Sequence, residues 1–234
     1  MQRGEAARPL VIVGVGGFSR ETAQAVHMCN ATGTVWEPRG FVDDDATRTG
    51  TTVDGLPVLG TIGSLPGWPD VLAVVGTGRP DNYTSRRAIV GRLGLPAERY
   101  ATIVHPSASL APTTALGVGT VILAGSIATA SVVVGDHVAV MPGVILTHDD
   151  VVDDYATITS GVRLGGGVHI GTGAYIGAGV LVRENVSIGP WAMIGMGSVV
   201  TRDVPAGELW LGTPARYLRD APIPRELLAD TARR

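Results

Sequence analysis

The segment Thr147-His148-Asp149-Asp150 carries the residue types best suited to chemistry in this chain. An imidazole beside a carboxylate is suited to general-base work near neutral pH, because free histidine titrates at about pH 6.5. Asp150 departs from its surroundings, where most six-residue repeats have a small or apolar residue at the same place, which we expect to face outward. The segment therefore predicts an unusually polar surface with His148 and Asp149 as candidate catalytic residues, or else an ordinary solvated turn.

Three consecutive glycines, Gly165-Gly166-Gly167, lie eighteen residues beyond this segment. If the chain coils with eighteen residues per turn, Gly166 stacks on His148 and places bare backbone beside the imidazole. Backbone N–H groups there could bind a thioester carbonyl or its oxyanion. The other interpretation is that the glycines only turn a corner.

The element that positions both segments is a repeat of six residues. Neither an α-helix, with period 3.6, nor a strand, with period 2, returns the same face at six, whereas a parallel β-helix of hexapeptides does. Three hexapeptides make one triangular coil, so residues eighteen apart stack about 4.8 Å from one another. The sequence therefore predicts an all-β parallel β-helix over residues 99–207. Its inward stripe of seventeen aliphatic residues is Val104, Leu110, Leu116, Ile122, Ala128, Val134, Val140, Leu146, Val152, Ile158, Leu164, Ile170, Ile176, Val182, Ile188, Ile194 and Val200.

Burial of this stripe alone does not offset the entropy of ordering about a hundred residues, at roughly 1 kcal/mol or more each. Packing between subunits must contribute, and we expect a homotrimer.

Residues 9–98 predict a small α/β domain of the Rossmann-like βαβ type. A strand at Leu10–Gly14 leads into a glycine-rich turn and a helix that runs to about Asn30, and further strands end at Asp44 and Val75. Ligands of such sheets bind at the carboxyl ends of the parallel strands. The domain is short and lacks the third glycine of a dinucleotide fingerprint, which argues against NAD. The candidate substrate-binding residues are Gly16, Gly17, Phe18, Asp43 and Asp44.

Composition limits the partners. A net charge of -3 gives no electrostatic reason to bind nucleic acid or an anionic membrane, and the single Cys29 excludes an intramolecular disulfide. No apolar run approaches the roughly 18 residues of a spanning helix, and residues 1–8 form a short polar tail rather than a signal peptide, so we expect a cytoplasmic protein. No two histidines are eighteen residues apart, so no metal site is expected within one chain, although three chains could pool ligands. Residues 208–234 form a C-terminal extension.

The chain as a whole resembles the sialic acid O-acetyltransferase family, which includes bacterial nucleotide-sugar N-acetyltransferases. The motifs that carry the resemblance are Gly14 to Glu21, Gly40 to Asp44, Ile103-Val104-His105-Pro106-Ser107-Ala108, Thr147-His148-Asp149, and Trp210-Leu211-Gly212-Thr213-Pro214-Ala215-Arg216. The resemblance implies a βαβ acceptor domain joined to a left-handed β-helix acyltransferase domain. It also implies His148 as general base, Asp149 as the acid that orients it, and direct attack of an acceptor amine or hydroxyl on acetyl-CoA or a longer acyl-CoA.

By the same resemblance, acetyl-CoA would lie in a groove between adjacent β-helices of a trimer, and the acceptor would be a sugar, a nucleotide-sugar or a glycosylated natural product. The residues implied for the coenzyme are Gly166, Gly167, Ala178 and Met196. Two departures argue against a uridine-linked amino sugar as acceptor: Phe18 and Thr157 stand where some members that bind uridine-linked sugars have histidine. Phe18 could instead stack on a base or a sugar face.

Two other functions fit a β-helix of this kind. A metal-dependent hydratase would need three histidines around zinc, and a non-catalytic sugar-binding scaffold would bind no CoA ester.

Overall fold

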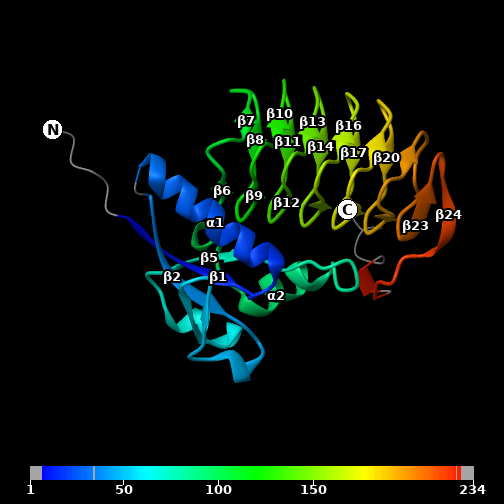
Figure 1. Ribbon diagram of the computed structural model, residues 1–234. Coiled ribbons are helices and arrows are strands. Elements are labelled where there is room, and N and C mark those ends of the chain that lie inside the picture. Colours follow the sequence, from blue (N-terminus) through cyan, green and yellow to red (C-terminus); the bar gives the residue numbers. More distant parts are fainter. Residues whose placement is uncertain (1–6, 34, 225, 228–234) are drawn as a thin grey trace.

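The computed structural model describes residues 7–33, 35–224 and 226–227, and it contains the two predicted kinds of domain. Most of the predicted polar tail therefore lies outside the described residues. Figure 1 shows a stack of coils running from β7 toward β24, with α1, β1 and α2 beside it.

The N-terminal domain is a five-stranded sheet of order β3-β4-β2-β1-β5, in which β1 pairs in parallel with β2 and β5. The last four residues of β1 are fully buried, as expected for a central strand with covered faces. The helix α1 follows β1 as predicted, whereas the short antiparallel hairpin β3–β4 was not predicted. The elements are β1 (Arg8–Val13), α1 (Gly17–Thr32), β2 (Trp36–Val42), β3 (Thr52–Val53), β4 (Leu56–Gly60), β5 (Leu72–Val75) and α2 (Ser85–Leu93), with 3-10 turns at Ala46–Arg48, Ile62–Gly67 and Ala97–Arg99.

The β-helix consists of two-residue strands that recur every six residues from Ile103 to Val200, and each ends on a residue of the predicted stripe. Residues eighteen apart pair in parallel, for example Ile127 with Ile145. The strands are β6 (Ile103–Val104), β7 (Ser109–Leu110), β8 (Ala115–Leu116), β9 (Val121–Ile122), β10 (Ile127–Ala128), β11 (Val133–Val134), β12 (Ala139–Val140), β13 (Ile145–Leu146), β14 (Val151–Val152), β15 (Thr157–Ile158), β16 (Arg163–Leu164), β17 (His169–Ile170), β18 (Tyr175–Ile176), β19 (Leu181–Val182), β20 (Ser187–Ile188), β21 (Met193–Ile194) and β22 (Val199–Val200).

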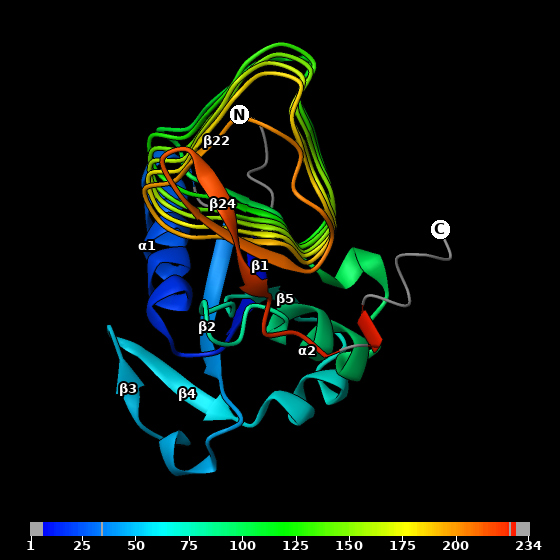
Figure 2. The same ribbon diagram turned by 90° about the vertical axis from the view of Figure 1, so that its right-hand side faces the viewer.

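These strands form the three sides of the coil: a six-stranded sheet (β22-β19-β16-β13-β10-β7), a five-stranded sheet (β20-β17-β14-β11-β8) and an eight-stranded sheet that ends in β23 (Glu208–Gly212) and β24 (Ala215–Asp220). Figure 2 looks along the coil axis and shows the three-sided outline with the N-terminal domain against one side. That side is the eight-stranded sheet, because Ile103 and Val121 share a core cluster with Leu10 and Phe41.

One prediction about the repeat is wrong. The fifth place of the hexapeptide does not face outward: Val132, Val144 and Val162 occupy it and are fully buried in the β-helix core. Asp150 stands at the same place and is also 0% exposed. The turn before each strand directs this side chain under the corner, so Asp150 is a buried carboxylate and not part of a polar surface.

The C-terminal extension joins the two domains. Beyond β24, Ala221, Ile223 and Leu227 cluster with Tyr83 of the N-terminal domain and Trp191 of the β-helix, and the Tyr83 hydroxyl donates to the Trp191 carbonyl at 2.8 Å. Within the described part of the chain, no helix is both long and apolar enough to cross a membrane.

Candidate active site

The turn between β13 and β14 presents His148 and Asp149 to solvent. Nδ1 of His148 lies 2.9 Å from Oδ2 of Asp149, and the two side chains are 67% and 68% exposed. Asp149 has a φ of 61°, a left-handed conformation that aspartate tolerates better than most residues. Because the carboxylate engages Nδ1, Nε2 is the ring nitrogen left to take up a proton.

Gly166 stacks on this imidazole from the next coil. A Cβ added at Gly166 would collide with the ring of His148, so only glycine leaves the ring in this place. The N–H of Gly167 donates to the His148 carbonyl at 2.9 Å, and that of Gly165 donates to Val182 at 2.9 Å. Among the described residues, the Gly166 N–H has no such bond, so it alone of the three can meet a carbonyl oxygen beside His148.

The other two residues implied for the coenzyme lie at a different corner. Ala178 and Met196 occupy stacked turns between the eight-stranded and six-stranded sheets, where the Gly197 N–H donates to the Ala178 carbonyl at 2.8 Å. His148 and Gly166 lie at the corner between the six-stranded and five-stranded sheets. A single chain therefore does not bring the four implied coenzyme residues together.

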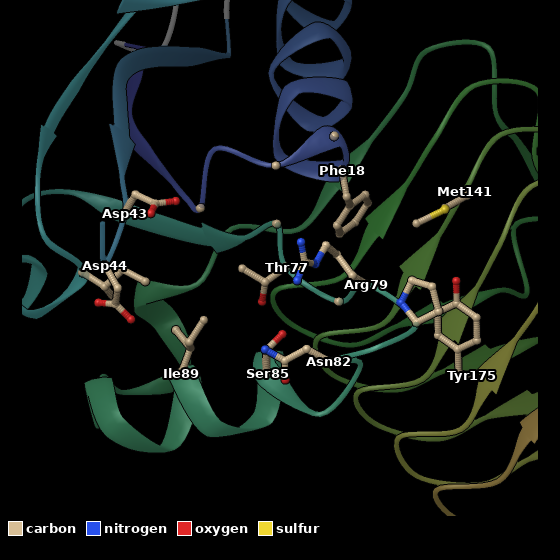
Figure 3. A pocket seen from close by; sticks show the side chains of 17 residues that line it. Phe18, Asp43, Asp44, Thr77, Arg79, Asn82, Ser85, Ile89, Met141 and Tyr175 are labelled. Carbon is tan, nitrogen blue, oxygen red and sulfur yellow. The ribbon is translucent and has the colours of Figure 1, made fainter. Parts of the chain in front are cut away.

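The five predicted substrate-binding residues line one cavity of about 530 Å³ at the carboxyl ends of β1, β2 and β5, which we call the acceptor pocket. Figure 3 shows Asp43 and Asp44 at one end and Met141 and Tyr175 of the β-helix at the other, with Phe18 above. The lining consists of Gly14, Gly16, Gly17, Phe18, Asp43, Asp44, Ile62, Gly76, Thr77, Gly78, Arg79, Pro80, Asn82, Ser85, Ile89, Met141 and Tyr175.

The two aspartates are already engaged within the chain. Asp43 accepts hydrogen bonds from the backbone N–H groups of Val15 (3.0 Å) and Asp45 (2.9 Å), so it holds the glycine-rich turn in place. Asp44 is bound by Arg92 at 2.7 Å and is half exposed. Asp43 is thus a shaping residue with oxygen lone pairs left over, and Asp44 is the more accessible acceptor.

The pocket depends on close packing between α1 and the end of β5. Ser19 donates to the Gly76 carbonyl at 2.8 Å, and a Cβ at Gly76 would lie 2.7 Å from the Ser19 Cα. Ser19 stands where a dinucleotide fingerprint has its third glycine. The glycine that allows the close approach is instead Gly76, on the opposite side of the contact, and the turn therefore forms without a glycine at position 19.

A buried arginine lies behind the pocket wall. Arg86 in α2 is 1% exposed, and it donates to the Thr77 carbonyl (2.6 Å) and, across the domain boundary, to Oγ1 of Thr157 (2.6 Å) and the Ala156 carbonyl (3.1 Å). Burial lowers its pKa to about 10. No carboxylate pairs with it among the described residues, so its charge is free to act on the pocket.

Sequence reasoning missed the β-helix wall of the pocket and Arg86. Gly76-Thr77-Gly78 carried a usable signal, because it ends a buried strand beside the glycine-rich turn. Met141 and Tyr175 carried none, since their role arises only from the docking of one domain on the other.

The acceptor pocket and His148 lie on opposite sides of the β-helix. Met141 and Tyr175 belong to the side formed by β12 and β18, which the N-terminal domain covers. The corner with His148 joins the two other sides, and a corner of a three-sided coil is opposite the remaining side. Within the described residues, no group of three histidine, cysteine or acidic side chains is placed to hold a metal ion.

Comparison with known proteins identifies the family. The model of the bacterial transferase hexapeptide (six repeats) matches residues 167–202. Comparison with curated protein sequences gives no match. The acetyltransferase domain of PglB from Neisseria gonorrhoeae is 30% identical, with a TM-score of 0.79 over 90% of this chain and 100% of that chain. A second structure of that domain, which covers 91% of this chain, is a complex with acetyl coenzyme A.

A mutant perosamine N-acetyltransferase from Caulobacter crescentus, in complex with CoA and GDP-perosamine, is 27% identical, with a TM-score of 0.81 over 92% of this chain and 99% of that chain. Together with the 30% identity over the whole PglB domain, these matches show that the chain belongs to the family of hexapeptide-repeat sugar acetyltransferases.

Proposed function

We propose that the protein transfers an acetyl group from acetyl-CoA to an amine or hydroxyl of a nucleotide-linked sugar, in a homotrimer whose active sites lie between subunits. The observation that carries the proposal is the exposed His148–Asp149 pair held against Gly166. It offers a base and an oxyanion donor side by side, which acyl transfer from a thioester requires.

The chemistry follows from this arrangement. Nε2 of His148 takes the proton from the acceptor as its nitrogen or oxygen attacks the thioester carbonyl carbon. The Gly166 N–H faces the oxygen on which negative charge develops, and Asp149 stabilises the imidazolium. The carbon–sulfur bond then breaks, and the proton passes from His148 to the departing thiolate. No residue becomes acylated.

The position of the acceptor pocket supports sites shared between chains. Because one chain places the pocket on the far side of the coil from its own His148, the two can meet only if the pocket of one subunit faces the His148 corner of the next. The six-stranded sheet offers an apolar outer face for this contact, on which Ile127 and Leu181 are 38% and 42% exposed. A ring of three subunits repeats the contact and closes it.

The same packing would assemble the coenzyme site. The corner with Ala178 and Met196 borders the six-stranded sheet on one edge, and the corner with His148 borders it on the other. A groove along this sheet, covered by a neighbouring β-helix, has backbone of both corners on its walls. The cytoplasm, where acyl-CoA is available, is the location that this proposal requires.

The charges around the pocket favour an acceptor that carries phosphate. Arg79 lines the pocket, Arg86 lies behind Gly78, and the N-terminus of α1 opens on it at Gly17. GDP-perosamine is the nucleotide-sugar in the Caulobacter crescentus complex. Phe18 supplies an aromatic face for the base or sugar.

A thiol-release assay with acetyl-CoA and longer acyl-CoAs, against nucleotide-linked amino sugars and the same sugars as glycosides, tests the proposal. We expect turnover that His148→Ala abolishes. The matched control is His169→Ala, which removes another surface histidine paired with an aspartate, Asp153, at 3.1 Å. Turnover that survives His148→Ala, or no release with any acceptor, would contradict the proposal.

A further inference from the structure

The turn that carries His148 departs from the backbone ladder of the β-helix. At corresponding places the first residue after the strand donates its N–H to the next coil, as Thr129 does to Leu146 at 3.1 Å and Gly165 to Val182 at 2.9 Å. The Thr147 N–H instead donates to Oδ2 of Asp150 at 2.7 Å.

The hydroxyl of Thr147 takes over the ladder contact, with the Leu164 carbonyl at 3.1 Å. Correspondingly, β13 and β16 pair only at Ile145 and Arg163, whereas β16 and β19 pair at two positions. The carboxylate of Asp150 is therefore inserted where the ladder opens, directly beneath His148.

The second oxygen of Asp150 reaches the coil that carries Gly166. Oδ1 accepts a hydrogen bond from the Val168 N–H at 2.9 Å. In several other turns the corresponding amide bonds within its own turn, as Ala174 does to the Gly171 carbonyl at 3.1 Å. Asp150 thus joins residues 147–150 to residues 165–168, the two turns that place the imidazole and the glycine N–H.

Stability of the coil does not call for a carboxylate at this place. Val132, Val144 and Val162 fill the equivalent positions and are fully buried, whereas a buried carboxylate must be stripped of water and needs its hydrogen bonds to offset that cost. The charged groups that act on it are its neighbours His148 and Asp149. The exception occurs at the one turn that carries the candidate base.

We propose that Asp150 is a positioning residue for acyl transfer, which clamps the His148 turn to the Gly166 turn through the Thr147 and Val168 N–H groups. This inference rests on the proposed function of His148. Asp150 does not touch the reacting atoms; it fixes the separation between the base and the oxyanion donor, and a misplacement of about 1 Å can cost on the order of a hundredfold in rate.

Asp150→Val tests the inference, because valine is the residue that the repeat accepts at this place. We expect kcat to fall by about tenfold or more while the KM for acetyl-CoA changes by less than about threefold. Asp150→Asn retains one acceptor oxygen and should lose less. The matched control is Thr120→Val, five hexapeptides before Asp150, which removes the equivalent bond from the Val138 N–H to Thr120 Oγ1 (3.0 Å) and should leave kcat unchanged.

Hydrogen exchange gives a second readout that does not depend on turnover. Asp150→Val should speed exchange at the Thr147 and Val168 amides, with the oligomeric mass unchanged. Loss of turnover in His148→Ala, measured in the same assay, separates the two claims. If His148→Ala is inactive and both Asp150 variants keep the wild-type kcat, the positioning role is overturned while the proposed function stands; if Asp150→Val fails to fold, Asp150→Asn decides.

Discussion

Gly166 lies directly against the imidazole of His148, from which it is separated by eighteen residues in sequence and one coil in space. This contact makes the side-chain volume at position 166 critical. Gly166→Ala would push a methyl group into the ring, so we expect kcat to fall by about tenfold or more, with little change in thermal unfolding. The matched control is Gly91→Ala in α2, where an added Cβ meets nothing. Steady-state kinetics decide, and equal kcat values for both variants would show that the ring position is not critical.

The stacking of Gly166 on His148 could be predicted from the sequence because the hexapeptide period is strict. A period of six, with three hexapeptides in each triangular coil, gives eighteen residues per coil, and this spacing places Gly166 over His148. The same analysis misplaced Asp150, although the alternation of side chains along a strand puts residue 150 on the same face as Val152, two residues further on in the predicted inward stripe. The valines at the fifth place proved to be core, and the carboxylate went inward with them.

Only part of the acceptor pocket could be predicted from the sequence. Parallel strands put Phe18, Asp43 and Asp44 at one edge of a sheet, so their proximity followed from the βαβ pattern. Tyr175 and Arg86 depend on how one domain docks on the other, and no pattern within either domain encodes that contact.

Arg86 should discriminate acceptors by charge. We expect Arg86→Met to raise the KM for a nucleotide-linked sugar by about tenfold, because a buried cation beside the pocket is lost, and to leave the KM for acetyl-CoA unchanged. The same sugar as a neutral glycoside should show little change. Arg39→Met, on an exposed arginine paired with Glu37, is the control. An equal rise in KM for both acceptors would mean that Arg86 only holds the domains together. In that case Arg86→Lys, which keeps the charge, would restore the KM of neither acceptor.

Phe18 should contribute by stacking. Loss of an aromatic side chain that stacks on a nucleobase costs about 1–3 kcal/mol of binding free energy. Phe18→Ala should therefore raise the acceptor KM by about tenfold or more, whereas Phe18→Tyr should retain binding. Isothermal titration of the free nucleoside diphosphate measures the same loss without turnover. Equal affinity of Phe18→Ala and the wild type would remove Phe18 from the acceptor site.

Two buried groups give the stability of the fold opposite dependences on pH. Burial lowers the pKa of His137 from 6.5 to about 4, so the unfolded chain binds a proton that the native chain does not. The free energy of unfolding therefore falls as the pH drops from 6.5 to 4, by on the order of 3 kcal/mol per chain from this group. Burial raises the pKa of Asp150 from 3.8 to about 6, so this group contributes stability that grows as the pH falls through 6 and is lost as it rises.

Urea unfolding between pH 4 and 7 resolves the two contributions. His137→Asn suits the left-handed φ of 54° at that position and should make the protein relatively more stable at pH 4.5 than the wild type is. Asp150→Asn should make the protein relatively less stable at pH 4.5, and relatively more stable at pH 7, than the wild type is. Parallel pH profiles for all three proteins would contradict both assignments.

The central claim is that His148 of one subunit serves the acceptor pocket of the next. Gly17→Trp supplies a blocked pocket, because a side chain at Gly17 meets nothing in the chain and lines the cavity. His148→Ala and Gly17→Trp should each be inactive alone. When they are unfolded and refolded together in equal amounts, every mixed trimer contains one site with both a histidine and an open pocket, so about one quarter of wild-type turnover should return. No recovery in trimers shown by mass to be mixed would contradict the account, and would place His148 and the pocket that it serves within a single chain.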